Sequence, residues 1–371
     1  MSDPQHNSIC ALNLLPQDLI EAILPFLPPK SLGRFKSVSK PWYSLISSPK
    51  FIKTHIHNYT KNNPNPNPSH MILDLGDSIY SIDIKQLNIQ PTPATLTAKR
   101  LNFQEPLYDI LGSCNGLLLA KDINHNLCFV NPATKNIIKV QGGFSIDQIY
   151  RFGYDSSTDD YKVISISRLG VSDSDIYTKF VRVYSLRNDL WNMLPNFSYE
   201  HDYLGPGVLL NHNLHWLISS IRSTMTIACC SLASEEIHEI ELPNYVYHVE
   251  GMYTQLFALG GKLAAIFCVG LHVNELWVME EYVVSNSWTK LCIIDNNMDQ
   301  CYEFFAQVSN RYILLGSNES NEIVMNDEED EIYIYDMDER RCTSVRVEGC
   351  PDEFVVCGTY AESLESPERF R

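Results

Sequence analysis

One stretch near the start of the chain places apolar residues at the spacing of helix faces. The pattern i, i+3, i+4, i+7 of one helix face is followed by Ile20, Ile23, Leu24 and Leu27. Pro25 lacks the amide hydrogen that a helix interior needs, so we expect this first helix to end near Leu24. Ser31 and Ser39 are placed to cap a second and a third helix. A further apolar run over 51–56 predicts a fourth helix.

Beyond residue 70 the pattern changes to short runs rich in Val, Ile, Tyr, Phe and Trp, separated by Gly, Asn and Asp. Such runs with turn residues between them predict β-strands. Comparable runs occur at 79–83, 128–131, 183–186, 229–232, 281–284 and 334–337. They recur at intervals of about 50 residues, which is typical of propeller blades of four strands each. We therefore expect an all-β domain, a β-propeller of about six blades, with a β-sandwich as the alternative.

Asn and Pro alternate between the helical and the strand-like parts, in TKNNPNPNPSH over residues 60–70. Such a stretch suits neither a helix nor a central strand, and it is expected to be a linker or exposed loop. The predicted organisation is a helical module, a linker, a β domain and a short tail. Their expected ranges are 10–58, 59–70, 71–364 and 365–371.

The helical module is too small to bury a self-sufficient core, since domains of about 40 residues usually need a staple, a metal or a partner. It resembles an F-box through Leu15-Pro16, Asp18-Leu19-Ile20, Ile23-Leu24, Leu27-Pro28, Lys30-Ser31-Leu32, Arg34-Phe35-Lys36, Val38-Ser39-Lys40, Trp42 and Leu45-Ile46. The resemblance implies docking on the Skp-type adaptor of ubiquitin ligases, and through it contact with cullin and RING subunits. The residues that we assign to the adaptor contact are Leu15, Pro16, Ile20, Leu24, Leu27, Leu32, Val38 and Trp42.

The β domain resembles the F-box-associated domain of plant F-box proteins, which include kelch-like and S-locus F-box proteins. The matching segments are 113–118 (SCNGLL), 131–135 (NPATK), 152–155 (FGYD), 160–164 (DYKVI), 183–186 (VYSL) with Trp191, 214–217 (LHWL) and 360–364. Their physical interpretation is structural. Asn115-Gly116 and Asn131-Pro132 are expected to form turns, and the aromatic residues to fill the space between blades.

Composition and charge limit the partners of each part. With 44% apolar and 20% charged residues, the chain has the composition of a folded protein. Residues 1–60 hold six Lys/Arg and three Asp/Glu, whereas the remaining chain holds 22 and 42. The acidic β domain is therefore not expected to bind nucleic acid, and the basic module suits an acidic partner. No apolar run is long enough to predict a membrane span, and the start lacks the pattern of a secretory signal, so we expect no membrane partner.

Eleven cysteines are scattered along the chain without a Cys-x-x-Cys pair. This pattern indicates free, mostly buried thiols in a reducing compartment, so a cytoplasmic or nuclear location is expected.

The sequence lacks the common motifs of catalytic and ligand-binding sites. Gly260-Gly261-Lys262 lacks the upstream glycine of a phosphate-binding loop. His212 and His215 are expected to point to opposite faces of a strand, and no cysteine has a histidine at a recognisable spacing. The sequence therefore assigns no catalytic residue, no metal ligand and no cofactor.

Two functions are compatible with this sequence. The first is a non-catalytic substrate receptor of a Skp-cullin-F-box ubiquitin ligase, whose β domain binds a protein destined for ubiquitination and degradation. The alternative is a propeller enzyme acting on a glycan or a small molecule. Loops are the natural binding surface of the β domain. The acidic run of Asp327, Glu328, Glu329 and Asp330 is the candidate substrate contact, to which a basic substrate would be drawn.

Overall fold

The computed structural model describes most of the chain. The described residues are 16–61, 70–76, 78–84, 94–142, 148–170, 177–194, 202–219, 225–243, 254–270, 273–295, 322–326, 332–336, 341–351 and 354–370. The chain divides into two compact units, Met1–Asn62 and Asn63–Arg371. Within the described residues, no helix is long and apolar enough to span a membrane.

The first unit consists of short helices. They are α1 (Gln17–Ile23), the 3-10 helix η1 (Leu24–Phe26), α2 (Pro29–Phe35), α3 (Lys40–Ile46) and α4 (Pro49–Lys61). The α-helical part ends at Ile23, as Pro25 predicts, and Ser39 caps α3 by accepting a hydrogen bond from the Trp42 amide at 3.3 Å. The expected cap at Ser31 is wrong, because α2 begins directly after Pro28, with Pro29 in its first turn.

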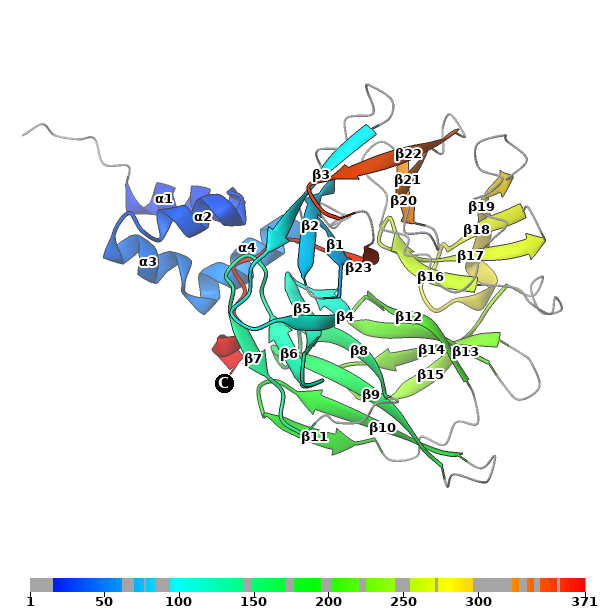
Figure 1. The fold of residues 1–371 in the computed structure, drawn as a ribbon. Helices are drawn as coiled ribbons and strands as arrows, with labels where there is room; N and C mark the ends of the chain where they lie inside the picture. The colour runs from blue at the N-terminus through cyan, green and yellow to red at the C-terminus, as the bar shows by residue number, and fades with distance from the viewer. Residues whose placement is uncertain are drawn as a thin grey trace, which may run out of the picture. The chain divides into compact units, whose positions relative to one another are not determined.

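The second unit is all-β, as expected, and is a β-propeller rather than a sandwich (Figure 1). Four of its sheets have four antiparallel strands each. The first two contain β4 (Leu107–Cys114), β5 (Leu117–Asp122), β6 (Leu127–Val130) and β7 (Ile137–Lys139), and then β8 (Gln148–Asp155), β9 (Asp160–Gly170), β10 (Tyr177–Ser185) and β11 (Leu190–Met193). The next two contain β12 (Asp202–Leu210), β13 (Asn213–Ser219), β14 (Met225–Ser231) and β15 (Ile237–Glu241), and then β16 (Thr254–Leu259), β17 (Lys262–Gly270), β18 (Val273–Met279) and β19 (Trp288–Asp295).

The fifth sheet has seven strands in the order β20-β21-β22-β3-β2-β1-β23. Its members are β1 (His70–Asp74), β2 (Ile79–Asp83), β3 (Ala94–Leu101), β20 (Glu322–Asn326), β21 (Ile332–Asp336), β22 (Arg341–Glu348) and β23 (Val355–Tyr360). Parallel pairing of β22 with β3 joins two antiparallel groups into this sheet. The expected number of about six blades is therefore approximate, because the runs at 79–83 and 334–337 belong to one hydrogen-bonded sheet.

Tight turns connect the strands where the sequence places Asn and Gly. Asn115 and Gly116 both have positive φ, and so do Gly260 and Gly261, which is the geometry of two-residue hairpin turns. The strand expected at 281–284 is wrong. Its residues lie in the connection between β18 and the 3-10 helix η4 (Ser285–Ser287), where Val283 has a φ of 64°.

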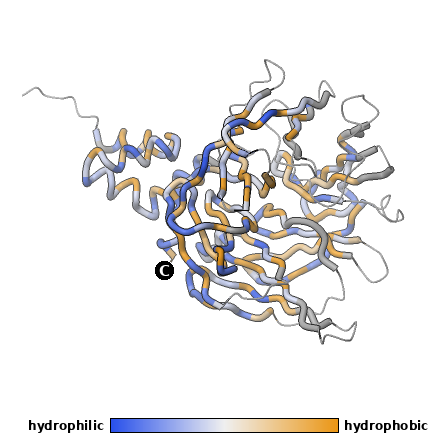
Figure 2. The backbone as a smooth tube through the Cα atoms, viewed as in Figure 1, coloured by the Kyte–Doolittle hydropathy of each residue, from blue (hydrophilic) through white to orange (hydrophobic). Residues whose placement is uncertain are grey.

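Apolar clusters fill the space between neighbouring sheets. One cluster combines Leu117 and Phe129 of the β4–β7 sheet with Phe152, Tyr161 and Tyr184 of the β8–β11 sheet. Comparable clusters join the β8–β11 sheet to the β12–β15 sheet and the latter to the β16–β19 sheet. Hydrophobic stretches along the strands supply these clusters (Figure 2). The blades are therefore stabilised mainly by burial against each other.

The ring is closed by the last strand of the chain. Strand β23 pairs antiparallel with β1, with His70 opposite Tyr360 and Asp74 opposite Val355. Beside this pairing, Ser113 donates a hydrogen bond of 2.5 Å to the Thr359 carbonyl. The two ends of the β unit thus pair with each other, and β1 is covered on both sides, by β2 and by β23.

The segment that follows β23 is held by a buried asparagine. Asn131 donates through its side-chain nitrogen to the carbonyls of Ser363 and Glu365, at 3.1 and 2.5 Å. Its side-chain oxygen accepts from the amides of Ala133 and Thr134, at 2.7 and 3.1 Å. Because Asn131 is fully buried, all of these bonds are needed to satisfy it.

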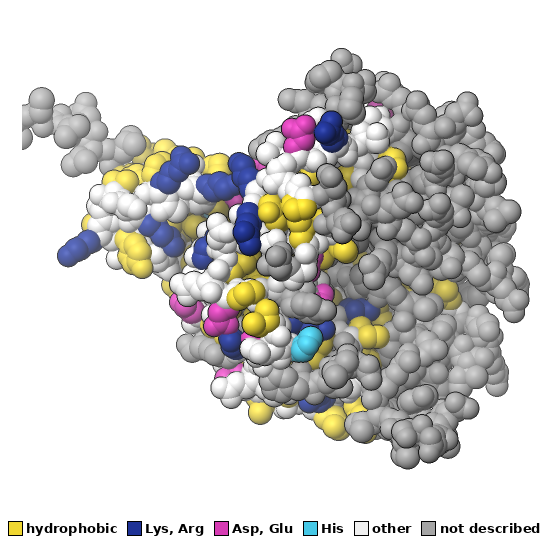
Figure 3. All heavy atoms as spheres, viewed as in Figure 1, with side chains coloured by type: hydrophobic (Ala, Val, Ile, Leu, Met, Phe, Trp, Pro, Cys, Tyr) yellow, Lys and Arg dark blue, Asp and Glu magenta, His cyan; other side chains and the backbone are white. Residues whose placement is uncertain are grey.

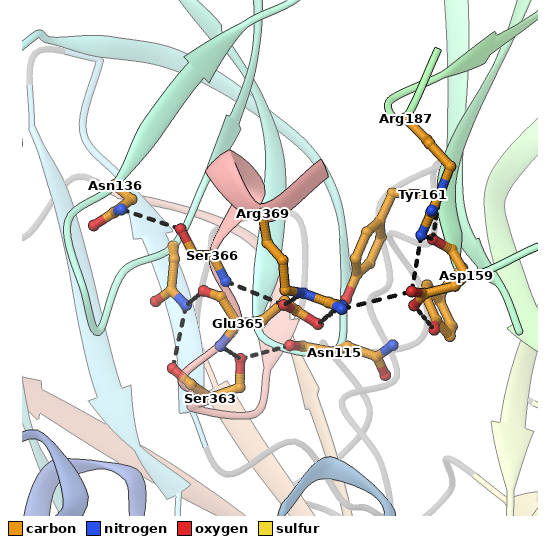
Figure 4. Close-up of polar contacts among 11 residues, drawn as sticks. Asn115, Asn136, Asp159, Tyr161, Arg187, Ser363, Glu365, Ser366 and Arg369 are labelled. Atoms are coloured by element: carbon orange, nitrogen blue, oxygen red, sulfur yellow. Dashed lines mark hydrogen bonds and ion pairs between the residues drawn. The ribbon is translucent and has the colours of Figure 1, made fainter. Parts of the chain in front are cut away.

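The same segment makes further polar contacts with the β4–β7 and β8–β11 sheets (Figure 4). Ser363 donates to the Asn115 carbonyl at 2.6 Å, and Asn136 donates to the Ser366 hydroxyl at 3.2 Å. The Arg369 guanidinium binds both carboxylate oxygens of Glu365, at 3.0 and 3.1 Å.

Residues 361–370 form what we call the C-terminal clamp, and they belong to the β unit. Glu365 is 1% exposed, and Phe370, in the 3-10 helix η5 (Pro367–Phe370), lies edge-on against Tyr161 in the apolar cluster. The segment expected to be a tail, 365–371, is therefore packed on the β unit as far as residue 370. Apolar and charged residues are mixed in this short segment without the spacing of a strand or a helix. Its burial could therefore not be predicted from the sequence.

We predict that Gly116→Ala destabilises the β unit more than Gly76→Ala does. Both glycines have a φ near 80°, which costs alanine about 1 kcal/mol. A Cβ at Gly76 would meet open space, whereas one at Gly116 would lie 2.6 Å from Ser363 Cβ and 2.7 Å from the Ala361 carbonyl oxygen. Crowding against the C-terminal clamp should add about 1–3 kcal/mol. Denaturant unfolding of the two variants measures the difference, and equal destabilisation would contradict the close approach of the clamp to the Asn115-Gly116 turn.

Candidate functional site

The helical unit has a small interior of its own. Leu24, Leu32, Ile46, Phe51 and Ile52 are buried. The 3-10 helix η1 packs against α1 and α4, and the side chain of His55 on α4 lies 2.9 Å from the Leu27 carbonyl oxygen. Burial lowers the pKa of His55, although this backbone contact opposes the shift. The short helices are therefore held together by a core of few residues.

A second set of apolar side chains on the same helices is exposed. Leu19 and Ile23 are each 49% exposed and lie four residues apart on α1, so they share one face. Phe26, Val38 and Tyr43 are about as exposed or more so. Apolar and basic side chains are both exposed on the visible face of this unit, interspersed with other residues (Figure 3). Exposed large apolar residues at this density are typical of a surface that another protein covers.

The residues assigned to the adaptor contact divide into three groups. Pro16 and Val38 are exposed, and Ile20, Leu27 and Trp42 are partly exposed. Leu24 and Leu32 are 3% and 0% exposed, so the expectation that they touch a partner is corrected: they belong to the core of the unit. Leu15 lies outside the described residues.

The adaptor contact expected from the sequence omits the outer stripe of Leu19, Ile23 and Phe26. These residues also follow helical spacing, i, i+4 and i+7, one position before Ile20, Leu24 and Leu27. A helix that is apolar on both sides has one face for its own core and one for a partner. That double stripe is the signal from which the exposed face could have been predicted.

In the β unit, the charged residues of the DYKVI segment connect neighbouring sheets. Lys162 is 5% exposed and donates to the Leu232 carbonyl at 2.5 Å and to Glu235 at 3.0 Å, while Asp155 lies 3.3 Å away. Burial acts to raise the pKa of Asp155, but hydrogen bonds from Ser157 and Thr158 and the charge of Lys162 outweigh it and lower the pKa to about 2. This lysine therefore joins the β8–β9 hairpin to the end of β14, which is a structural role.

The structure brings one cysteine and one histidine together. Strand register places Cys229 opposite His215, and the Cys229 sulfur lies 3.3 Å from His215 Nε2, so the absence of a recognisable pair in the sequence did not exclude one in space. The Tyr282 hydroxyl lies 2.9 Å from the same nitrogen and accepts a hydrogen bond from Asn213 at 2.7 Å.

This trio does not have the properties of a catalytic site. His215 and Cys229 are 0% exposed. Burial raises the pKa of the Cys229 thiol, so the thiolate that a nucleophile needs is disfavoured. Burial also lowers the pKa of His215 to about 4, with the Val208 carbonyl opposing the shift. The trio anchors the connection that carries Tyr282 to the neighbouring sheet.

Two further kinds of site were considered in the sequence, a metal site and an acidic substrate contact. Among those residues, no group of three His, Cys, Asp or Glu side chains is arranged to hold a metal ion. The acidic run of Asp327, Glu328, Glu329 and Asp330 lies outside the described residues.

Comparison with known proteins gives a family match for both units. The model of the F-box domain matches residues 12–54, and the model of the F-box associated beta propeller domain matches residues 70–366. F-box protein CPR1 of Arabidopsis thaliana is 26% identical, with 92% of this chain and 86% of that protein covered. F-box/kelch-repeat protein At3g23880 of Arabidopsis thaliana is 30% identical, with 77% and 80% covered.

Solved structures give a weaker likeness. An oligogalacturonate lyase in complex with manganese has a TM-score of 0.43 and 12% identity, with 72% of this chain and 70% of that chain covered. A similarity at this level carries no argument about activity.

We predict that His215 stays neutral between pH 7.5 and 5 in the folded protein. Its folded pKa of about 4 lies below the unfolded value of about 6.5, so the unfolded state takes up the proton first. Its contribution to stability is present above pH 6.5 and is lost as the pH falls towards 4, by about 3 kcal/mol. NMR titration of the histidine ring carbons measures this pKa. A His215 signal that titrates near 6.5 would contradict the buried, neutral ring.

Proposed function

The chain belongs to the F-box proteins that carry an F-box associated β-propeller domain, and from this membership we propose that it is a substrate-recognition subunit of a Skp-cullin-F-box ubiquitin ligase. The F-box unit would dock on a Skp-type adaptor, which links it to the cullin and RING subunits. The β-propeller would bind a protein target for ubiquitination and proteasomal degradation.

The observation that carries the adaptor half of the proposal is the exposed apolar face of the F-box unit. Leu19, Ile23 and Phe26 lie on helices that are too short to be stable without burial elsewhere, yet these side chains are left outside the unit's core. Burying them on an adaptor would gain the free energy that the small unit cannot gain internally. The excess of Lys and Arg in residues 1–60 suits an acidic adaptor surface.

The propeller half of the proposal requires no chemistry from this chain. A receptor acts by holding a substrate lysine near a ubiquitin thioester on another subunit, which raises the effective concentration of the reactants. The closed ring is suited to that task because its strands form a rigid scaffold from which loops can vary. We propose that the acidic run Asp327–Asp330 is one substrate contact, which would attract a basic protein.

A propeller enzyme remains the second candidate, and the described residues favour the receptor. Among the described residues, His215 and Cys229 come together, but both are buried in the sheet, and their pKa values are shifted away from reactivity. Cys114, Cys128, Cys229 and Cys230 are buried free thiols. This suits a reducing compartment, so we propose a cytoplasmic or nuclear location.

We predict that Leu19→Asp with Ile23→Asp weakens binding of a purified plant Skp adaptor by at least about 30-fold. Truncation of an interface anchor typically costs about 2 kcal/mol or more, and a charge on an apolar contact face costs further desolvation. Both side chains are exposed in the free protein, so its thermal unfolding should hardly change. Calorimetric titration of the adaptor with the full chain measures the affinity.

The control for this double variant is Glu21→Ala, at an exposed residue of the same helix that lies two positions from both Leu19 and Ile23 and therefore on the opposite face. It should bind the adaptor normally. Full affinity in the double variant, or an equal loss in the control, would contradict docking through this face. The pair Leu15→Ala and Pro16→Ala, at the start of the unit, is expected to weaken adaptor binding in the same way.

A further inference from the structure

A cavity of about 250 Å³ opens between the outer strands of two neighbouring blades. It lies where the end of β15 meets β18, η4 and β19. Its lining includes Glu241, Pro243, Trp277, Ser285, Asn286 and Trp288. Neither the F-box face nor the C-terminal clamp includes any of these residues. The cavity is therefore distinct from both of these features.

The indole N–H groups of Trp277 and Trp288 both donate hydrogen bonds to nearby residues, which fixes the two rings. Trp288 donates to the Glu241 carbonyl at 3.1 Å and is 7% exposed. Trp277 donates to the Glu275 carboxylate at 2.9 Å, and Glu275 is 4% exposed. Because both ring N–H groups already have acceptors, the rings offer a ligand their faces and carbon edges. Walls fixed in this way are pre-organised for binding.

This part of the blade already holds a cation. The ammonium group of Lys290 lies 5.3 Å from the centroid of the Trp277 ring and 2.5 Å from Glu275 Oε1. An ammonium within about 6 Å of a tryptophan face is attracted by the ring quadrupole. Lys290 is thus held by an aromatic face and a carboxylate. The cavity offers the same combination, with Trp277 and Trp288 as the aromatic faces and Glu241 as the carboxylate.

Size and charge indicate which ligand suits the cavity. Its volume is below the range of roughly 300–1,000 Å³ that is typical of small-molecule sites, and it is large enough for one long side chain. Among the described residues that line it, Glu241 carries the only charge. The chain beyond residue 60 holds 42 acidic and 22 basic residues, which adds a long-range attraction for cations.

We propose that this cavity takes a Lys or Arg side chain of the bound protein substrate. The cation would lie between the tryptophan rings and the Glu241 carboxylate, with the hydroxyl of Ser285 and the amide oxygen of Asn286 available as acceptors. The inference rests on the proposed function, since it names the chemistry by which the propeller of a substrate receptor recognises one residue of its target.

The test uses the full chain with tryptophan indoles labelled by ¹⁵N, of which there are five. The probes are acetyl-Gly-Arg-Gly-amide, the same peptide with Lys, and the same peptide with citrulline as the uncharged isostere of Arg. We expect the Arg and Lys peptides to shift the indole signals of Trp277 and Trp288, and the citrulline peptide to bind at least about fivefold more weakly. Methyl β-glucoside serves as a carbohydrate probe and should leave the signals in place.

Two variants connect the binding to the cavity. Glu241→Gln removes the charge and should weaken the Arg peptide by about threefold to fivefold. Glu239→Gln is the matched control, because Glu239 is an exposed acid on the same strand that does not line the cavity. Trp277→Leu should abolish the shifts of Trp288, and unchanged thermal unfolding of the Glu241→Gln variant shows that its loss of binding is local.

Three results would overturn the inference. They are equal binding of the citrulline and Arg peptides, equal effects of Glu241→Gln and Glu239→Gln, and shifts caused by the glucoside but not by the peptides. Adaptor binding is measured on the same samples. If the wild-type chain binds the adaptor but not the peptides, only the proposed cavity site is rejected. If the wild-type chain does not bind the adaptor, the proposed receptor function is rejected.

Discussion

Antiparallel pairing of β23 with β1 joins the two ends of the β unit, and the structure of the blades depends on it. Each sheet buries its apolar residues against the next one, so an open ring would expose a face at each end as well as two strand edges. The C-terminal clamp reinforces the closure, because Asn131 and Asn115 of the β4–β7 sheet bind Ser363 and Glu365. Three segments that resemble the F-box-associated domain, 113–118, 131–135 and 360–364, thus meet at the C-terminal clamp.

Much of this architecture could be predicted from residues with strong local preferences. Pro25, Ser39 and the Asn115-Gly116 turn act within a few residues of themselves, so sequence spacing was enough to place them. The division into helices and strands followed from the change in apolar period. The predicted number of blades was less accurate. The parallel pairing of β22 with β3 joins residues far apart in the sequence, and the spacing of apolar residues does not indicate it.

What could not be predicted depends on the tertiary environment. Tyr282 lies in a run that is rich in β-formers, yet its hydroxyl is used by His215 and Asn213 from another sheet, and the run is a connection between strands. Leu24 and Leu32 have the same chemistry as Leu19 and Ile23, and only the packing of η1 and α2 decides which pair is buried. The C-terminal clamp has no periodic pattern, since its residues are held singly by distant partners.

The two units differ in how they use apolar residues. The propeller buries most of its described apolar residues in clusters between its sheets, whereas the small F-box unit leaves Leu19, Ile23 and Phe26 exposed on its short helices. Hydrogen exchange of the full chain, with and without a Skp adaptor, tests this division most directly. The account predicts that β1 and β23 exchange as slowly as the central strands in both states, and that the adaptor slows exchange in α1 and its neighbours only. Fast exchange in β23, or protection by the adaptor in the blades but not in α1, would contradict it.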